Sequence, residues 1–134
     1  MPVLVHTRSS AFKGARIKYG DPLHLDDAAI DFPDLTLLMA HAGWPFWYPR
    51  AFWIARRRAN AYLEISGLPA KKLLEDFPAL GGLPDKVVYG SDWPGNPSLR
   101  RNVEAICTLP LPGETKQKIL SRNAARILNV EVRE

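Results

Sequence analysis

Four short apolar runs recur along the chain, and each of them ends abruptly in a polar residue. The runs end at His6, His41, Ser66 and Asp92, which are 25 to 35 residues apart. That spacing is the size of a strand followed by a helix, so it predicts an α/β fold with parallel strands joined by right-handed crossovers. Ligands bind at the carboxyl ends of such strands, which makes the terminating polar residues the candidate site.

The last of these runs gives the clearest example. Val87–Tyr89 shows no alternation of polar and apolar residues, which is typical of a strand buried on both faces. Pro94 and Gly95 end the strand shortly afterwards, so Asp92 is expected at its carboxyl end. An aspartate in this position can also simply cap a turn. The functional interpretation gains weight because two other runs end in histidine.

The segments between the runs supply the predicted loops and helices. Residues 7–20 form a long polar loop after the first strand, and long loops at the carboxyl end of a strand are often functional. Asp21 and Pro22 are typical of a helix start. Helices are predicted at about residues 23–31, 50–59, 73–77, 96–107, 114–121 and 123–128.

Composition indicates a soluble globular protein. The chain has 134 residues, of which 46% are hydrophobic and 24% charged, so we expect a single domain over residues 1–134. The net charge of +4 falls largely on predicted helices, and nucleic-acid motifs are absent, so no nucleic-acid partner is expected. We also find no leader and no apolar run long enough for a membrane span, and we expect a cytoplasmic location.

The single cysteine and one of the three histidines are interpreted as structural. Cys107 alone forms neither an internal disulfide nor a cysteine-based zinc site. It follows the apolar residues Val103 and Ile106, which predicts a place in the core. His24 lies on a predicted helix and is expected to face solvent.

A set of motifs occurs in a fixed order along almost the whole chain: Pro2–Thr7, Gly20–Leu23, Asp31–Leu35, Ala40–Pro45, Leu63–Gly67, Tyr89–Pro94 and Asn123–Leu128. Together they resemble the carboxyl-terminal half of the amidohydrolase-related family (amidohydrolase 2). That family comprises metal-dependent hydrolases and decarboxylases built on a (β/α)8 TIM barrel. The resemblance implies that this chain is a half-barrel, with its strands in the places of barrel strands five to eight.

The resemblance also implies a metal site. His6 and Asp92 match the family's ligands to a divalent metal, and His41 matches a histidine that contacts the metal-bound water or the substrate. Zinc is the expected metal, with manganese as the alternative, and His6, His41 and Asp92 are the candidate ligands. Zinc lowers the pKa of a bound water from about 15.7 to about 7. Asp92 can then accept its proton, while His41 stabilises a developing oxyanion or a departing carboxylate.

Three further residues are candidates for substrate binding. Trp44 and Trp93 follow His41 and Asp92 closely, and their rings can stack on a flat unsaturated acid or merely pack the loops together. Arg8 can pair with a substrate carboxylate or lie at the surface.

The expected function is therefore metal-dependent hydrolysis or decarboxylation of a small carbonyl or carboxylate compound. The alternative is an inactive half-barrel that serves as an assembly or binding module, because the His-x-His pair of the family's first strand has no counterpart. An open flavodoxin-like sheet is less favoured, since the phosphate loop is missing. A half-barrel has open edges. We therefore expect a homo-oligomer, a complementary amino-terminal half, or a chain that is a fragment of a longer protein.

Overall fold

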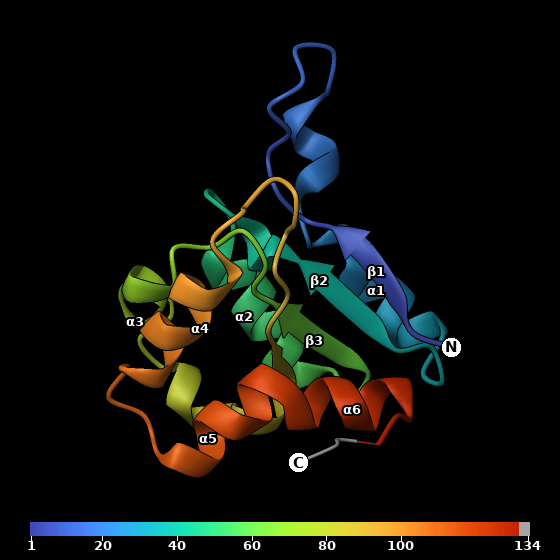
Figure 1. Cartoon of the computed structure of the whole chain (residues 1–134). Helices are drawn as coiled ribbons and strands as arrows, with labels where there is room; N and C mark the ends of the chain where they lie inside the picture. Colours follow the sequence, from blue (N-terminus) through green and yellow to red (C-terminus); the bar gives the residue numbers. More distant parts are fainter. Residues whose placement is uncertain (132–134) are drawn as a thin grey trace. The chain divides into compact units, whose positions relative to one another are not determined.

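The computed structural model describes residues 1–131 of the chain. Strands and helices alternate along it, as the spacing of the apolar runs predicts (Figure 1). The backbone divides into two compact units, Met1–Glu64 and Ile65–Glu134, which we call the first and second units. None of the helices in the described part of the chain is both long and apolar enough to cross a membrane.

The first unit is built on parallel strands that pair in chain order: β1 (Val3–His6), β2 (Leu37–Ala40) and β3 (Ala61–Glu64). At their carboxyl ends, His6 lies opposite Ala40, and Ala40 lies opposite Glu64. Residues paired in this way project from the same face of a sheet. The sheet therefore carries the side chains of His6 and Glu64 on one face, with the small Ala40 between them.

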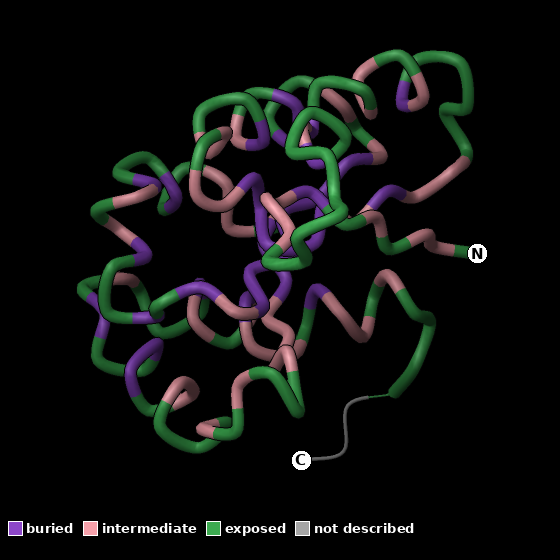
Figure 2. Tube along the Cα trace, turned by 90° about the horizontal axis from the view of Figure 1, so that it is seen from above, coloured by how far each residue is buried: buried purple, intermediate pink, exposed green. Residues whose placement is uncertain are grey.

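The two faces of this sheet differ in burial. Leu37, Met39 and Leu63 on one face are at most 2% exposed. Leu4, on the face that carries His6, is 61% exposed. β1 accordingly alternates between half-buried and exposed residues, which is visible beside the N label in Figure 2. One face of β1 is thus open to solvent, although parallel strands normally bury both faces.

Two helices complete the first unit, α1 (His24–Asp31) and α2 (Tyr48–Arg57). The predicted N-cap at Asp21 lies too early, because α1 begins at His24 and has Leu23 at its N-cap position. The Asp21 carboxylate instead accepts the Leu23 backbone N–H at 3.0 Å in the turn before the helix. His24 is exposed on α1, which confirms the prediction. Short 3₁₀ turns connect the elements of both units: η1 (Ile17–Gly20), η2 (His41–Gly43), η3 (Ala70–Lys72), η4 (Leu80–Gly82) and η5 (Pro84–Lys86).

A bidentate ion pair joins α1 to the end of α2. The guanidinium of Arg58 donates to both carboxylate oxygens of Asp26, at 2.7 and 2.9 Å. This hydrogen bonding holds the pKa of the Asp26 carboxyl below its usual value. Close by, the side-chain amide of Asn60 donates to backbone carbonyls at the end of α1 and in the following loop. The basic run of residues 56–58 at the end of α2 is therefore only partly a solvated face.

The second unit contains one short strand and several helices: α3 (Leu73–Asp76), β4 (Val87–Val88), α4 (Leu99–Cys107), α5 (Gly113–Gln117) and α6 (Asn123–Leu128). The Ile65 N–H donates to Val88 O at 2.9 Å beside β4. Tyr89 directly follows β4, and its backbone N–H donates to Ile119 O in the helical segment Lys118–Arg122, at 2.9 Å. The strand therefore ends earlier than the apolar run predicts, because a helical segment takes over its hydrogen bonding.

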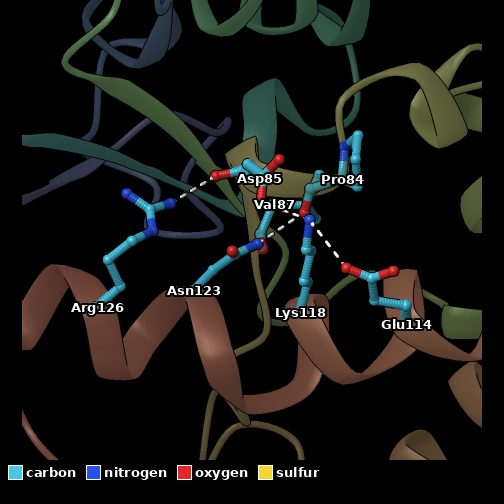
Figure 3. Close-up of polar contacts among 7 residues, drawn as sticks. All are labelled: Pro84, Asp85, Val87, Glu114, Lys118, Asn123 and Arg126. Atoms are coloured by element: carbon cyan, nitrogen blue, oxygen red, sulfur yellow. Dashed lines mark hydrogen bonds and ion pairs between the residues drawn. The ribbon is translucent and has the colours of Figure 1, made fainter.

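The predicted closing helices form one continuous helical run, in which a π-helical segment (Lys118–Arg122) joins α5 to α6. Asn123 fastens this run to the residues before β4 (Figure 3). Its side-chain amide donates to Pro84 O and to Val87 O, both at 2.8 Å, and the residue is 2% exposed. Lys118 adds an ion pair to Asp85 at 2.9 Å, which raises the pKa of the lysine.

The predicted core position of Cys107 is wrong, because the thiol is exposed at the end of α4. The preceding Ala105 and Ile106 are buried, with 8% and 1% exposure. Each residue of an α-helix turns the side chain by about 100°. The Cys107 side chain therefore projects about 100° away from that of Ile106 around the helix axis, outside the buried face of α4.

Candidate functional site

Two of the predicted site residues meet in the first unit. His6 is the last residue of β1, and His41 directly follows β2. Their imidazole rings have centroids 5.1 Å apart, with the ring planes inclined by 75°. His41 is 8% exposed, whereas His6 lies open on the uncovered face of the sheet. The sequence argument that strand ends converge therefore holds for this pair.

The backbone around His41 adopts an unusual conformation. His41, Ala42 and Gly43 have φ angles of 64°, 45° and 83°, so consecutive residues lie in the left-handed region. A residue with a Cβ pays about 1–2 kcal/mol for this conformation. Such strained positions cluster at functional sites, where the surrounding structure compensates for their cost. The turn fixes the direction in which His41 leaves the sheet.

Thr7 holds this turn against the end of β1. Its hydroxyl donates to Ala40 O at 2.8 Å and accepts a hydrogen bond from the Gly43 N–H at 3.2 Å. The side chain is 1% exposed, so both bonds lie in a low-dielectric interior, where they are stronger than in water. Thr7 is a site residue that the strand-end pattern does not indicate. The sequence feature that could have indicated Thr7 is a hydroxyl residue directly after the histidine that ends the first apolar run.

Asp92 occupies a similar turn in the second unit. Its φ angle is 56°, and its carbonyl oxygen accepts the Asn96 N–H at 2.8 Å. Ser91 supports the turn by accepting the Trp93 N–H on its hydroxyl at 3.2 Å. Aspartate tolerates the left-handed region better than most residues. His41 and Asp92 therefore share a backbone conformation as well as a place after a strand, and each turn continues into a cis Trp–Pro peptide.

The predicted substrate-binding residues have different surroundings. The Arg8 guanidinium lies 4.8 Å from the ring centroid of Trp44, close enough for a cation–π interaction. Trp44 is half-buried, and Arg8 lines a pocket together with His6. Trp93 lies in the second unit and is 73% exposed. The first unit thus brings Arg8, Trp44 and the histidine pair into one neighbourhood.

The histidine pair has a spacing that fits a shared metal ion. Zinc–nitrogen bonds of about 2.0–2.1 Å at tetrahedral angles place two imidazole centroids about 5 Å apart. The observed separation of 5.1 Å agrees with this value, and it is equally that of an edge-to-face contact between two rings. Within residues 1–131, however, no group of three or more histidine, cysteine, aspartate or glutamate side chains forms a candidate metal site. The ring spacing is therefore compatible with two imidazole ligands on one metal ion, and the role of Asp92 as a further ligand stays a prediction.

Glu64 is a buried acid outside the set of residues that the motifs indicate. It ends β3, is 6% exposed, and projects from the same face of the sheet as His6. Charged side chains are rarely buried to this extent unless they are paired. The available signal was a carboxylate inside the otherwise apolar run of residues 61–65. A buried acid at this end of the sheet is a further candidate member of the site.

Comparison with known proteins decides the family. The model of the amidohydrolase family Amidohydro_2 matches residues 1–130. The chain belongs to the amidohydrolase family. Among solved structures, this amidohydrolase chain is similar to the uncharacterised TIM-barrel protein Bb4693 of Bordetella bronchiseptica, with 33% identity and a TM-score of 0.78. The match covers 96% of this chain and 46% of that protein. No curated protein matches the sequence.

Two similar structures of lower identity are decarboxylases. They are 5-carboxyvanillate decarboxylase LigW from Sphingomonas paucimobilis, with 22% identity and a TM-score of 0.66, and 2,6-dihydroxybenzoate decarboxylase from Rhizobium, with 18% and 0.61. Each match covers 96% of the amidohydrolase chain, but 49% and 51% of the respective structures. The chain thus spans about half the length of the structures it matches. The predicted fold, half of a TIM barrel, is confirmed.

Proposed function

We propose that this chain provides the metal-binding, carboxyl-terminal half of a hydrolase or decarboxylase that acts on a small carbonyl or carboxylate compound. The observation that carries the proposal is the His6–His41 pair, with centroids 5.1 Å apart at the carboxyl ends of β1 and β2. Membership of the amidohydrolase family supports it. The two decarboxylases among the similar structures favour a carboxylate substrate.

In this proposal His6, His41 and Asp92 hold a divalent cation, zinc or manganese. The neutral imidazoles supply two nitrogen ligands, and the carboxylate adds the negative charge that a divalent ion favours. When bound, such a cation acidifies a water molecule and polarises a carbonyl or carboxylate oxygen. The left-handed turns at His41 and Asp92 orient both side chains before substrate arrives, which lowers the cost of assembling the site.

The chain's own residues have separate tasks in the reaction. Asp92 accepts the proton of the attacking water on its carboxylate. His41 would serve either as the third ligand or, through its ring N–H, as a donor to the oxygen on which negative charge develops, and its burial at 8% exposure would strengthen that hydrogen bond. Trp44 and Trp93 offer flat faces against which a planar substrate stacks. Because Arg8 lies over the Trp44 ring, its charge is held close to such a substrate.

A partner is part of the proposal. β1 pairs with β2 on one side, and Leu4 is 61% exposed on the open face of the strand. The backbone groups of β1 that face away from β2 form an edge of the sheet, and such an edge can pair with a further strand. We propose that a complementary amino-terminal half-barrel or a second copy of this chain covers it. The proposal also places the protein in the cytoplasm, where the free thiol of Cys107 stays reduced.

Metal analysis of the purified chain tests the proposal. We expect about one zinc or manganese ion per site after purification from supplemented medium, and we expect His6→Asn and Asp92→Asn to remove most of it. His24→Asn and Asp34→Asn are matched controls, because both residues are exposed outside the site, and they should retain the metal. Absence of metal from the unmodified chain would favour the alternative function, an inactive half-barrel that serves as an assembly or binding module.

A further inference from the structure

A pocket of about 320 Å³ opens beside His6 in the first unit. The polar loop that follows β1 forms its wall, and this loop rises beyond the strand's carboxyl end in Figure 1. Besides His6, the lining includes Arg8, Ser10, Arg16 and Tyr19. The volume lies at the lower end of the range for small-molecule sites, roughly 300–1,000 Å³. The pocket therefore suits a small acid or a fragment of a larger one.

The lining chemistry selects an anion. Two arginines, a phenol and a hydroxyl are present, and none of the lining residues is acidic. Guanidinium groups present a planar fork of donors that matches the two oxygens of a carboxylate. A phenol or a hydroxyl can donate a further hydrogen bond to the same group. A carboxylate bound here would lie next to the histidine pair.

Arg8 is held in place from several sides. The neighbouring Ser9 N–H donates to Trp44 O at 3.1 Å, and the Arg8 guanidinium lies over the Trp44 ring. On the other side Gly20 approaches so closely that a Cβ there would overlap the carbonyl oxygen of Arg8. Glycine is thus required at position 20 for the loop to close against Arg8. A pocket that is organised in advance loses less entropy when it binds a ligand.

We propose that this pocket is a carboxylate-recognition site, in which Arg8, Arg16 and Tyr19 hold the carboxylate of a small planar acid beside His6. The inference rests on the proposed function, since it adds a binding subsite beside the candidate metal ligands of that enzyme. It adds Arg16 and Tyr19, which no sequence motif indicates. Because His6 lines the pocket, a carboxylate held there keeps the rest of the substrate beside the histidine pair. That carboxylate is therefore a group other than the one that reacts.

Binding of benzoate and benzamide to the metal-free full chain tests this site, because benzamide has the same shape without the charge. Calorimetry or NMR titration after chelator treatment excludes binding through a metal. We expect benzoate to bind about tenfold more tightly than benzamide, and Arg16→Gln to remove most of that preference. Arg56→Gln is the matched control, because Arg56 is exposed like Arg16 but lies outside the pocket. It should leave the preference intact.

Several outcomes would overturn the assignment: equal affinity for benzoate and benzamide, no effect of Arg16→Gln, or tighter binding of inorganic phosphate than of benzoate. Tyr19→Phe provides a second variant that should fold normally, since Tyr19 is 65% exposed, and it should weaken benzoate binding. The metal content of the chain tests the proposed function, whereas the benzoate titration tests the pocket. Bound metal without benzoate preference contradicts the pocket alone, whereas benzoate preference without bound metal supports the pocket and contradicts the proposed function.

Discussion

Gly43 and Thr7 are joined by a hydrogen bond of 3.2 Å from the glycine N–H to the threonine hydroxyl, across 36 residues of sequence. The same hydroxyl donates to Ala40 O, so one side chain fixes both ends of the turn that carries His41. The position of the second imidazole thus depends on a residue that acts through the backbone of the turn. Thr7 is a positioning residue of the candidate site.

Thr7→Val should destabilise the first unit, because it removes the hydroxyl while keeping the shape of the side chain. The Gly43 N–H then loses its partner and the Ala40 carbonyl keeps only the Thr7 backbone N–H, at a cost of about 1–3 kcal/mol. Urea unfolding measures the change. Thr108→Val is the control, because its hydroxyl also donates to a carbonyl, that of Ala105, but at an exposed helix end. An equal loss in both variants would contradict the role assigned to Thr7.

Gly43→Ala should also destabilise the chain, by about 1–2 kcal/mol, because the φ angle of 83° is unfavourable for any residue with a Cβ. The added methyl would lie 3.2 Å from the Trp47 Cβ. Gly82→Ala is a matched control, since an added Cβ there meets nothing within 4 Å. Thermal unfolding of the two variants should separate them, and similar melting temperatures would contradict the expectation.

Asn123→Ala should destabilise the second unit by about 2–4 kcal/mol, because two carbonyls before and within β4 lose their donor. Asn102→Ala on α4 serves as the comparison, because Asn102 is only half-buried. Chemical denaturation followed by circular dichroism measures both losses. A cost for Asn123→Ala as small as that for Asn102→Ala would show that the closing helices are held by their apolar contacts alone.

The Asp26–Arg58 pair predicts a pH dependence of stability. The hydrogen bond from Arg58 holds the pKa of Asp26 in the folded chain below its ordinary value of 3.8, so folding favours the ionised carboxylate. This contribution is fully present above pH 3.8 and is lost as the pH falls through the lower folded pKa. Asp26→Asn should therefore lose stability at pH 7 and show a smaller decline in acid, which urea unfolding across the pH range will measure. An unchanged acid decline would contradict it.

Periodic features of the fold were predictable from the sequence. The apolar runs predicted the strand positions because buried parallel strands require such runs, and the predicted closing helices agree closely with the continuous helical run that follows β4. The strand-end argument also brought His6 and His41 together. Family membership and the half-barrel fold followed from motifs spread over the whole chain.

The remaining features depend on tertiary contacts that leave weak local signals. The left-handed turns at His41 and Asp92 are unexpected for residues other than glycine, and the surrounding hydrogen bonds favour them. Cys107 was misplaced because a pattern of apolar neighbours does not reveal where the buried stripe of a helix ends. Glu64 was missed because one acid in an apolar run carries no indication of its own burial.

The open face of β1 has a consequence for how the chain behaves in the laboratory. Leu4 presents a branched hydrocarbon to water next to unpaired strand backbone, a combination that promotes adhesion between molecules. Light scattering from the isolated chain should therefore rise steeply with concentration. Co-expression with a polypeptide that caps this edge should improve the yield of dispersed material, and Leu4→Lys should achieve the same without any partner.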